Sequence, residues 1–592
     1  MSTEYRKKLI EVALPLEAIN AAASREKSIR HGHPSTLHLY WARRPLATAR
    51  AVLFAQLVDD PSSRPEEFPT IEEQDAERAR LHKLIEDLVQ WENSNNESLL
   101  QQARAEIRKS NDGELPAVLD PFAGGGAIPL EAQRLGLEAH ASDLNPLAVL
   151  INKALIEIPP KFAGRPPVFP GAKEDQTSWS KAEGLAEDIR RYGRWMRDEA
   201  EKRIGLHYPK VVAPGGTEHT VIAWIWARTV KSPNPANPIE TPLVRSWWLS
   251  KKKGHEAYVV PEVVDGRIHF SVEHNVNGPV ESDDGTVGRT GARAVGDDTP
   301  IPLAEIREQA TKSGFGTRLL AVVADAEPGR LYISPSEDQE HAGLIDRYQI
   351  QAPEALMPEK ALGFRVFAYG YRKWTDLFSA RQLLAMTTFS GLVAEVRNKV
   401  LADSVDAASG QDLGSGQDAE AAASYADAVA TYLALAVSRL ADYSSNICTW
   451  HNSGEKMRNV FSRQAIPMAW DFAEVNPFSD SSGNFLGQVD WVAKATEHSP
   501  ADKPGTASQV PAQSQEYSGM VVSTDPPYYD NVGYSDLSDY FYVWLRPMLE
   551  AIYPDVVGTM LTPKSEELVA NPYRLGGKEE AEAFFVKGFN SV

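Results

Sequence analysis

Several residue classes are scarce in this 592-residue chain, and each scarcity excludes a class of protein. A single cysteine, Cys448, excludes an internal disulfide and favours a reducing compartment, so we expect a cytoplasmic protein in which this thiol is buried and unreactive. No run of about 18 apolar residues is present, and the charged start of the chain lacks a signal-peptide core. We therefore expect no membrane partner.

Positive charge is also in short supply, because the net charge is -20 at pH 7. Phosphate contacts require Lys and Arg, so the net charge argues against a simple nucleic-acid binder, but the distribution of charge matters more than its sum. The segment around residues 33–45 mixes aromatic rings with guanidiniums, and residues 251–253 are three consecutive lysines. The first segment either helps to close a cofactor pocket or simply packs between domains, and both roles remain open. The three lysines either contact a phosphate backbone or form an ordinary solvated face. The candidate nucleic-acid contacts are Tyr40, Arg43, Arg44, Lys251 and Lys252.

A glycine-rich turn follows the apolar run 117–120, which is typical of a buried strand. The pattern predicts a helix over residues 127–135, with Gly136 at its C-cap. The next predicted strand, residues 138–142, delivers Asp143 about 20 residues after the turn, a spacing that suits a carboxylate accepting from ribose hydroxyls. Asn145 and Pro146 then look like the N-cap and first residue of another helix. We favour a nucleotide-type cofactor site over a plain tight turn between strand and helix.

A second motif, Asp525-Pro526-Pro527-Tyr528, follows the apolar run 519–524, which predicts a buried parallel strand ending at the lip of a sheet. Two prolines remove two backbone donors and fix two φ angles, so the groups around them are held rigidly. An acid, a fixed carbonyl and a ring suit the recognition of a flat, amine-bearing base. Alone, the tetrapeptide is more often a proline turn after an ordinary strand, and it needs support from elsewhere in the chain.

Together the two motifs resemble those of the amino-methyltransferases that use S-adenosylmethionine. The glycine loop lacks the Lys-Ser/Thr of a P-loop and the Gly-x-Gly-x-x-Gly spacing, which argues against other nucleotide cofactors. The resemblance narrows to the large prokaryotic adenine-specific DNA methylases, which carry an N-terminal domain of unknown function and an inserted zinc ribbon. It rests on residues 33–47, the Asp120 loop and residues 374–378, 470–478 and 525–544. It implies an α/β fold: a Rossmann-like methyltransferase sheet with a large mixed α+β insertion and a helical N-terminal region.

The resemblance implies S-adenosyl-L-methionine as cofactor and assigns roles to both motifs. The expected cofactor-binding residues are Asp120, Pro121, Phe122, Gly124, Gly126, Asp143 and Asn145. The expected catalytic residues are Asp525, Pro526, Pro527 and Tyr528. Asp525 and the Pro526 carbonyl would accept hydrogen bonds from an exocyclic amine, and Tyr528 would stack on the base, which must be flipped out of a duplex. Tyr529 stacks or packs; the sequence does not separate these.

The insert departs from the resembled family, whose zinc ribbons carry two cysteine pairs. The corresponding positions here are Ser232, Asn237, Ala294 and Asp297. Because a structural zinc site needs four good ligands, we expect the hairpins to persist and no metal to be bound.

The chain divides by composition into a series of regions. We expect a helical N-terminal region (1–110), a first part of the core with the cofactor loop (111–165), an inserted domain (166–360), a helical region (361–495) and a second part of the core (517–592). Flexible stretches are expected near residues 403–420 and 497–516. After Tyr528 the sequence predicts one or two helices and little strand, so the methyltransferase sheet is expected to be incomplete, with the chain truncated.

The function favoured is methylation of the adenine N6 amine in DNA, with DNA as partner. Methylation of cytosine N4 or of an RNA base remains open, because the tetrapeptide does not choose between these amines. A non-catalytic DNA- or partner-binding subunit of a restriction or phage-defence complex, alongside helicase, ATPase or nuclease subunits, is the alternative of another class.

Overall fold

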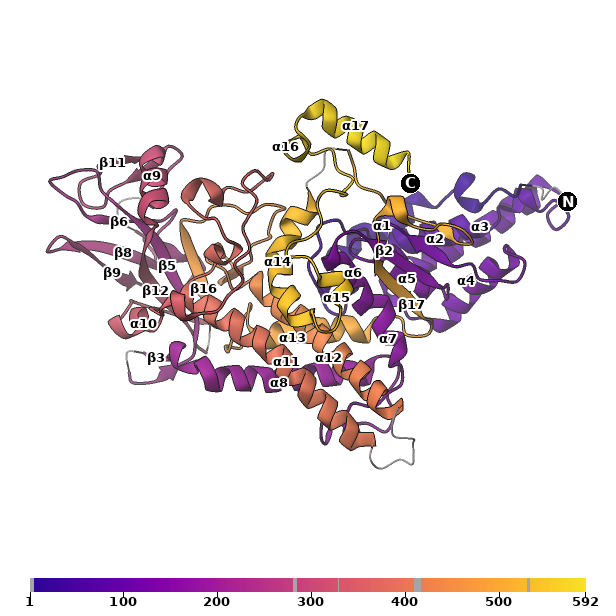
Figure 1. The fold of residues 1–592 in the computed structure, drawn as a ribbon, viewed down its shortest axis with the longest axis horizontal. Helices are drawn as coiled ribbons and strands as arrows, with labels where there is room; N and C mark the ends of the chain where they lie inside the picture. The colour runs from indigo at the N-terminus through magenta and orange to yellow at the C-terminus, as the bar shows by residue number, and fades with distance from the viewer. Residues whose placement is uncertain (1–4, 214, 280–284, 328, 409–416, 530–532) are drawn as a thin grey trace.

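The computed structural model describes residues 5–592 except 214, 280–284, 328, 409–416 and 530–532. Within these residues the chain has a mixed α/β fold with several sheets, one of them parallel. Figure 1 shows an elongated molecule with the N-terminal helices at one end and an antiparallel sheet at the other. Long helices run between the two ends.

The parallel sheet has the strand order β17-β2-β1-β18, in which the central strands β1 and β2 are the best buried. Its strands are β1 (Val118–Asp120), β2 (Ala139–Asp143), β17 (Gly505–Gln509) and β18 (Val521–Val522). Helix α5 (Ala127–Arg134) connects β1 to β2, and α6 (Pro146–Asn152) follows β2. The strands and helices expected between residues 117 and 152 are confirmed, with Gly136 in the left-handed conformation after α5.

Two outer strands differ from expectation. The stretch 497–516 was expected to be flexible, but it contains β17, which pairs with β2 from Gly505 to Gln509. Its small polar residues hide the strand from a periodicity argument, yet they permit close packing: a Cβ at Gly505 would lie 2.8 Å from the Ile156 carbonyl oxygen. The run 519–524, expected as a buried strand, forms only the two-residue β18, whose Val522 is 37% exposed.

Four N-terminal helices pack beside the parallel sheet, as the helical pattern of residues 1–110 predicts. They are α1 (Leu16–Glu26), α2 (Leu46–Leu57), α3 (Ile71–Leu88) and α4 (Glu97–Lys109). Helix α2 is buried nearly all round and contacts α5. Between α1 and α2 the chain runs as short turns through residues 33–45, and this segment reaches the end of the parallel sheet.

A layer of long helices joins the two ends of the molecule. It consists of α8 (Glu183–Ile204), α11 (Ala380–Ala408), α12 (Gln417–Ala441) and α13 (Phe485–Glu497), preceded by the short α7 (Ile158–Lys161). The flexible loop expected near 403–420 is only partly described: its ends belong to α11 and α12, and residues 409–416 lie outside the described part. Within α12, residues Ala419–Ala441 are long and apolar enough to span a membrane by length and composition, but 78% of that window is buried by the protein itself.

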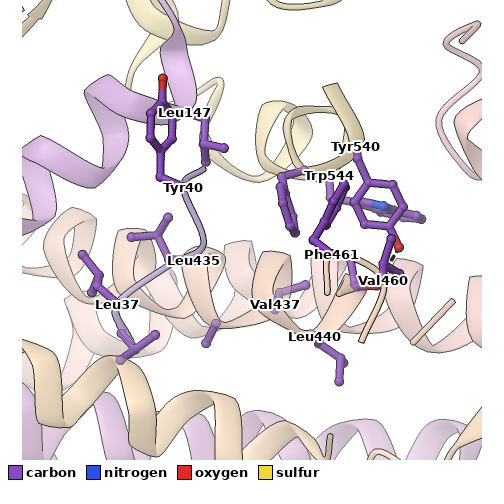
Figure 2. Packing of buried hydrophobic residues seen from close by; sticks show 14 of the residues in the cluster. Leu37, Tyr40, Leu147, Leu435, Val437, Leu440, Val460, Phe461, Tyr540 and Trp544 are labelled. Atoms are coloured by element: carbon purple, nitrogen blue, oxygen red, sulfur yellow. Dashed lines mark hydrogen bonds between the residues drawn. The ribbon is translucent and has the colours of Figure 1, made fainter. Parts of the chain in front are cut away.

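The helix α12 is the centre of the hydrophobic core. Figure 2 shows Tyr40 of the N-terminal segment above α12 next to Leu147 of α6, and Leu37 of the same segment at the level of α12. Tyr540 of α14 (Tyr534–Leu549) packs edge-to-face on Phe461 at a ring-centroid distance of 5.1 Å and donates to the Ala441 carbonyl at 2.7 Å. Segments more than 400 residues apart therefore share one core.

The far end of the molecule is built on a five-stranded sheet with the order β13-β12-β5-β16, in which β6 also pairs with β5. Its strands are β5 (Val221–Lys231), β6 (Glu240–Leu243), β12 (Gly316–Asp325), β13 (Arg330–Ile333) and β16 (Asp471–Val475). The pairing of β16 with β5 joins the ranges expected separately as 166–360 and 361–495. The apolar runs at 221–226 and 258–260 lie in β5 and in β8 (Ala257–Val264), respectively.

Smaller elements complete this end and the C-terminal part. The remaining strands are β3 (Val211–Val212), β4 (Glu218–His219), β7 (Trp248–Ser250), β8 (Ala257–Val264), β9 (Arg267–Glu273), β10 (Gly291–Arg293), β11 (Pro300–Pro302), β14 (Thr449–His451) and β15 (Lys456–Arg458). The remaining helices are α9 (Leu303–Ser313), α10 (Glu337–His341), α15 (Pro554–Val557), α16 (Pro572–Leu575) and α17 (Lys578–Phe589). After β18 the described chain forms helices and no strand. Cys448 is fully buried, as expected, and burial raises the pKa of its thiol.

A buried ionic network fastens the N-terminal helices to the parallel sheet. Glu131 of α5 accepts from Arg50 of α2 at 2.5 Å and from Arg134 at 3.1 Å, and all three side chains are almost completely buried. The two guanidiniums also donate to the backbone and side chains of residues 88–95. Although burial alone would raise it, the pKa of Glu131 is lowered by Arg134 and Arg50.

We expect Glu131→Ala to destabilise the protein by about 3–5 kcal/mol, because it leaves two buried guanidiniums without a carboxylate. The denaturant midpoint of unfolding measures the change. Glu92→Ala is the matched control: it removes an exposed partner of Arg25 and should leave the midpoint almost unchanged. Equal midpoints for the two variants would contradict the assignment of the network as the fastening.

Candidate functional site

Asp120 lies at the carboxyl end of β1, buried to 2% exposure. Its Oδ1 accepts from the Phe122 backbone N–H at 3.1 Å and from the Thr524 hydroxyl at 2.6 Å. Thr524 directly precedes the Asp525 motif and follows β18. One carboxylate oxygen thus shapes the turn after β1 and ties it to the loop after β18.

Asp143 lies at the end of β2, where it accepts from two backbone N–H groups. Gly124 donates to its Oδ2 and Asn145 to its Oδ1, each at 2.8 Å. The Asn145 side chain caps α6 by accepting from the Leu147 N–H at 3.0 Å, as the sequence predicts, and it donates to Ser538 of α14 at 2.7 Å. Asp143 and Asn145 therefore fix the glycine loop relative to α6 and α14.

The glycine loop is packed from above by the N-terminal segment. Gly124 and Gly126 have φ of +49° and +81°, in the left-handed region. A Cβ at Gly124 would lie 3.0 Å from Cε1 of Tyr40, and one at Gly125 would lie 3.5 Å from Cγ of Arg43. Gly124 favours glycine because of its positive φ and because Tyr40 passes directly over it, whereas the distance at Gly125 is an ordinary van der Waals contact.

At the loop after β18, Asp525 and Tyr528 contact each other and a cation. The Tyr528 hydroxyl donates to Oδ1 of Asp525 at 3.2 Å, and Arg44 forms an ion pair with Oδ2 of the same carboxylate. Arg44 also donates to the Tyr528 hydroxyl at 2.6 Å, and its guanidinium lies 5.2 Å from the centre of the Tyr528 ring. Tyr528 is 57% exposed, so this group lies at the mouth of the site.

Both motifs and the N-terminal segment line one cavity of about 310 Å³, a volume within the usual range for small-molecule sites. Every expected cofactor-binding residue except Gly126 lines it, as do all four expected catalytic residues. Gly126 instead forms the N-cap of α5 directly behind the loop. Of the expected nucleic-acid residues, Tyr40, Arg43 and Arg44 also line it.

Lys251 and Lys252 lie elsewhere, at the end of β7 in the antiparallel part. Lys252 pairs with Glu455 at 3.1 Å, and Lys251 lies 5.2 Å from the centre of the Trp248 ring. Neither lines the cavity between the two motifs. The structure therefore separates these lysines from the other residues named as nucleic-acid contacts.

The cavity is also lined by residues that the sequence did not assign to the site. Pro511 to Gln513 follow β17, and Glu566 and Glu567 follow α15. Glu567 accepts from the Ser535 N–H at 3.1 Å and pairs with Arg574 at 2.5 Å, which fixes the start of α14. Only their position in the fold reveals them, because each lies in an irregular segment with no motif.

Aromatic rings surround the mouth. Trp41 and Tyr534 lie parallel, with ring centroids 6.5 Å apart and an interplanar angle of 4°, and both line the cavity. Gln464 also lines the cavity and donates to the Trp41 carbonyl at 3.4 Å. Most other rings of α14, including Tyr540 and Trp544, are core residues.

The carboxylates at the two strand ends have perturbed acidities. Burial raises the pKa of Asp120 to about 7, against the opposing hydrogen bonds from Thr524 and Phe122. Burial likewise raises the pKa of Asp143 to about 6, against the backbone hydrogen bonds from Asn145 and Gly124. Asp120 is buried and Asp143 half-buried, and a pair of acids with raised pKa values in one cavity is typical of a functional site.

The hydrogen-bond acceptors of the site suit an organic ligand with hydroxyl and amine groups. A carboxylate offers about four acceptor positions, and backbone N–H groups use two of those on Asp143. The remaining positions can accept from a ribose diol. Within the described residues, no group of three or more His, Cys, Asp or Glu side chains gathers closely enough to hold a metal ion.

The hairpins expected in the insert are present, and their turns contact each other. The turn between β5 and β6 meets the turn between β10 and β11 where Asn234 donates to Asp297 at 2.8 Å. The pKa of Asp297 is lowered to about 2 by hydrogen bonds from the Thr299 N–H and from the side chains of Asn237 and Asn234. Hydrogen bonds from Asn234 and Asn237 to the Asp297 carboxylate thus join the two turns.

Comparison with known families matches residues 13–84 to a domain described as a protein of unknown function (DUF1156). The matched range includes α1, α2 and the segment that carries Tyr40, Arg43 and Arg44 over the glycine loop. No curated protein and no solved structure is significantly similar to the chain.

We expect Asp120→Asn to stabilise the ligand-free protein at pH 8 and not at pH 4.5. Because the folded-state pKa is raised, the wild-type carboxyl contributes stability that is complete below about pH 4 and is lost as the pH rises through about 7. The amide stays neutral and keeps the acceptor for Thr524, so its advantage grows with pH, to at most about 4 kcal/mol.

Thermal unfolding at the two pH values measures this difference. Asp265→Asn is the control, since Asp265 is an exposed hairpin residue at φ +49°, where Asn is well tolerated. A pH-independent effect of Asp120→Asn would show that Asp120 is ionised throughout and would contradict its raised pKa.

We expect Gly126→Ala to destabilise the protein more than Gly113→Ala does. Both glycines have positive φ, +81° and +90°, so each substitution carries a strain cost of about 1–2 kcal/mol. Only at Gly126 does the added Cβ also approach Asn152 Oδ1 and Leu155 Cδ1, at 2.8 and 2.9 Å, whereas nothing lies within 4 Å at Gly113. The difference between the two thermal midpoints isolates the steric part; equal midpoints would show that the loop yields freely.

Proposed function

We propose that the chain is an S-adenosylmethionine-dependent methyltransferase that acts on the exocyclic N6 amine of adenine in DNA. The observation that carries the proposal is the hydrogen bond from Thr524 to Asp120, which brings the two motifs, about 400 residues apart in sequence, to one cavity. The order β17-β2-β1-β18 supports a Rossmann-like core, because ligands of parallel sheets bind beyond the carboxyl ends of the strands. The resemblance of the two motifs to those of amino-methyltransferases supplies the reaction class.

In this proposal the residues of the glycine loop and of β2 hold the cofactor. Asp143 accepts from ribose hydroxyls with its remaining lone pairs, and Asp120 keeps the loop in shape through Phe122. S-adenosylmethionine, when bound, supplies the electrophilic methyl group. Tyr40 and its neighbours, which lie over Gly124 and Gly125, exclude water from the inner part of the cavity.

The Asp525 motif holds the target. Asp525 and the Pro526 carbonyl accept hydrogen bonds from the two amine hydrogens, which turns the nitrogen lone pair toward the methyl donor. As the nitrogen gains a bond, positive charge grows on it, and the adjacent carboxylate stabilises that charge. The methylated nitrogen is then cationic and acidic, and it releases one proton to solvent water. Tyr528, exposed at the mouth, offers its ring to a base extruded from the duplex.

The N-terminal helical region has two proposed roles. Its residues 40–44 line the cavity, so the region of unknown function that matches residues 13–84 is proposed to complete the cofactor pocket. Arg43 and Arg44 are exposed and cationic, which suits contact with DNA phosphates despite the net charge of -20.

We expect Asp525→Ala to reduce methyl transfer at least 100-fold and leave cofactor affinity unchanged, because Asp525 faces the target amine and Asp143 the cofactor. Purified protein is incubated with DNA or RNA and labelled cofactor, and the nucleic acid is digested to nucleosides. Calorimetry with S-adenosylhomocysteine measures cofactor binding separately, and Asp265→Asn is the control variant.

The outcomes separate the alternatives. Label in N6-methyladenine from DNA supports the proposal, whereas label in N4-methylcytosine or in RNA assigns the same chemistry to another amine. No binding of S-adenosylhomocysteine by the wild-type chain would reject the methyltransferase and favour a binding subunit.

A further inference from the structure

Arg44 contacts both groups that would recognise the target base in the proposed function, the carboxylate of Asp525 and the ring of Tyr528. Its Nε contacts Oδ2 of Asp525, its Nη2 donates to the Tyr528 hydroxyl, and its guanidinium lies over the Tyr528 ring. A guanidinium is planar, carries N–H donors and stacks on aromatic rings. An amine-bearing base has the same three properties. The carboxylate and ring assigned to the base are therefore occupied by the chain's own cation.

We propose that Arg44 is an internal placeholder for the target base, which must displace it to reach Asp525. The inference rests on the proposed function of the Asp525 motif and adds a specificity device to it. A ligand enters only if it replaces the ion pair, the hydrogen bond to Tyr528 and the ring contact together. Water or a simple amine replaces only some of them.

The location of Arg44 makes such an exchange feasible. The side chains of Arg44 and Asp525 are 41% and 28% exposed, so the pair is solvated and worth little compared with a buried one. Arg44 lies between the turn at residues 41–43 and the start of α2 at Leu46, and it can leave without disturbing the helix. Its neighbour Arg43 is held differently, because it donates to the His38 carbonyl and does not contact Asp525.

The ion pair of Arg44 with Asp525 also offsets negative charge at the mouth of the cavity. Asp525 without a partner would be a carboxylate in a cavity that already contains Asp120 and Asp143, whereas Glu567 is paired with Arg574. Arg44 offsets that charge while the base is absent. When the base arrives, the freed guanidinium remains beside the entry of the cavity.

The test uses 9-ethyladenine, which presents the amine and ring but no ribose or phosphate and requires no recognition sequence. S-adenosylhomocysteine is added at saturation so that the probe does not occupy the cofactor position. Binding to the full chain is measured by NMR titration of the probe signals. We expect Arg44→Ala to bind 9-ethyladenine roughly three- to fivefold more tightly than the wild type, because the competing cation is removed.

Chemical rescue separates competition from a structural effect. Methylguanidine should weaken binding of 9-ethyladenine to Arg44→Ala and have little effect on the wild type, in which Arg44 already fills the position. Tyr528→Phe, which keeps the ring but removes the acceptor for Nη2, should give a smaller increase in affinity. Arg25→Ala, which removes an exposed arginine paired with Glu92 outside the cavity, should behave as the wild type.

Every outcome of these measurements either supports or overturns the placeholder role of Arg44. Equal or weaker binding by Arg44→Ala, with no competition by methylguanidine, would overturn the placeholder and make Arg44 a contributor to base binding or a bystander. Failure of the proposed function has a different signature: S-adenosylhomocysteine fails to bind, or no variant binds 9-ethyladenine, in which case the placeholder falls with it.

Discussion

The hydrogen bond between Thr524 and Asp120 is the contact on which the site depends. It closes the pairing of β18 with β1, which involves only two residues of each strand. Since β18 is short and half exposed, the backbone ladder alone holds it weakly. The side-chain bond to a buried carboxylate adds a directional constraint, and it sets the position of Asp525 one residue later. The geometry of one motif is in this way fixed by the acid of the other.

Local patterns in the sequence were sufficient for the inner part of the site. The run into Asp120, the glycines, the cap at Asn145 and the spacing to Asp143 are set by near neighbours, and the structure has these elements where the pattern predicts them. The outer part depends on contacts across hundreds of residues. β17 contains Gly, Thr, Ala, Ser and Gln, and its strand form comes from pairing with β2 and packing on Ile156. No periodicity within residues 497–516 carries that information.

The same distinction explains Arg44 and β16. Sequence composition marked Arg44 as a cation for phosphate, but its partner Asp525 lies 481 residues further on, and the pair forms only because the segment before α2 passes over the glycine loop. The strand β16 joins β5 from across a helical region, so a division of the chain by composition separates strands that share a sheet. Composition divides a chain into stretches, whereas pairing decides which stretches form one unit.

Burial of the Asp120 carboxylate reduces the free energy of unfolding, and packing alone does not explain why an acid occupies this position. A neutral amide could accept from Phe122 and Thr524 equally well, and burial disfavours the ionised carboxylate, as its raised pKa shows. Burial also raises the pKa of Asp143 on the neighbouring strand, but there both carboxylate oxygens accept backbone N–H groups, which an amide with one oxygen could not do. Two adjacent strands therefore end in acids whose ionised forms are disfavoured by burial. Both acids lie beside the cavity, under the aromatic and cationic residues of the N-terminal segment. This placement indicates that the site needs their charge or their strength as hydrogen-bond acceptors. The ion pair of Arg44 with Asp525 fits this arrangement, because it covers with a removable cation the one acid of the group that the proposed target must reach.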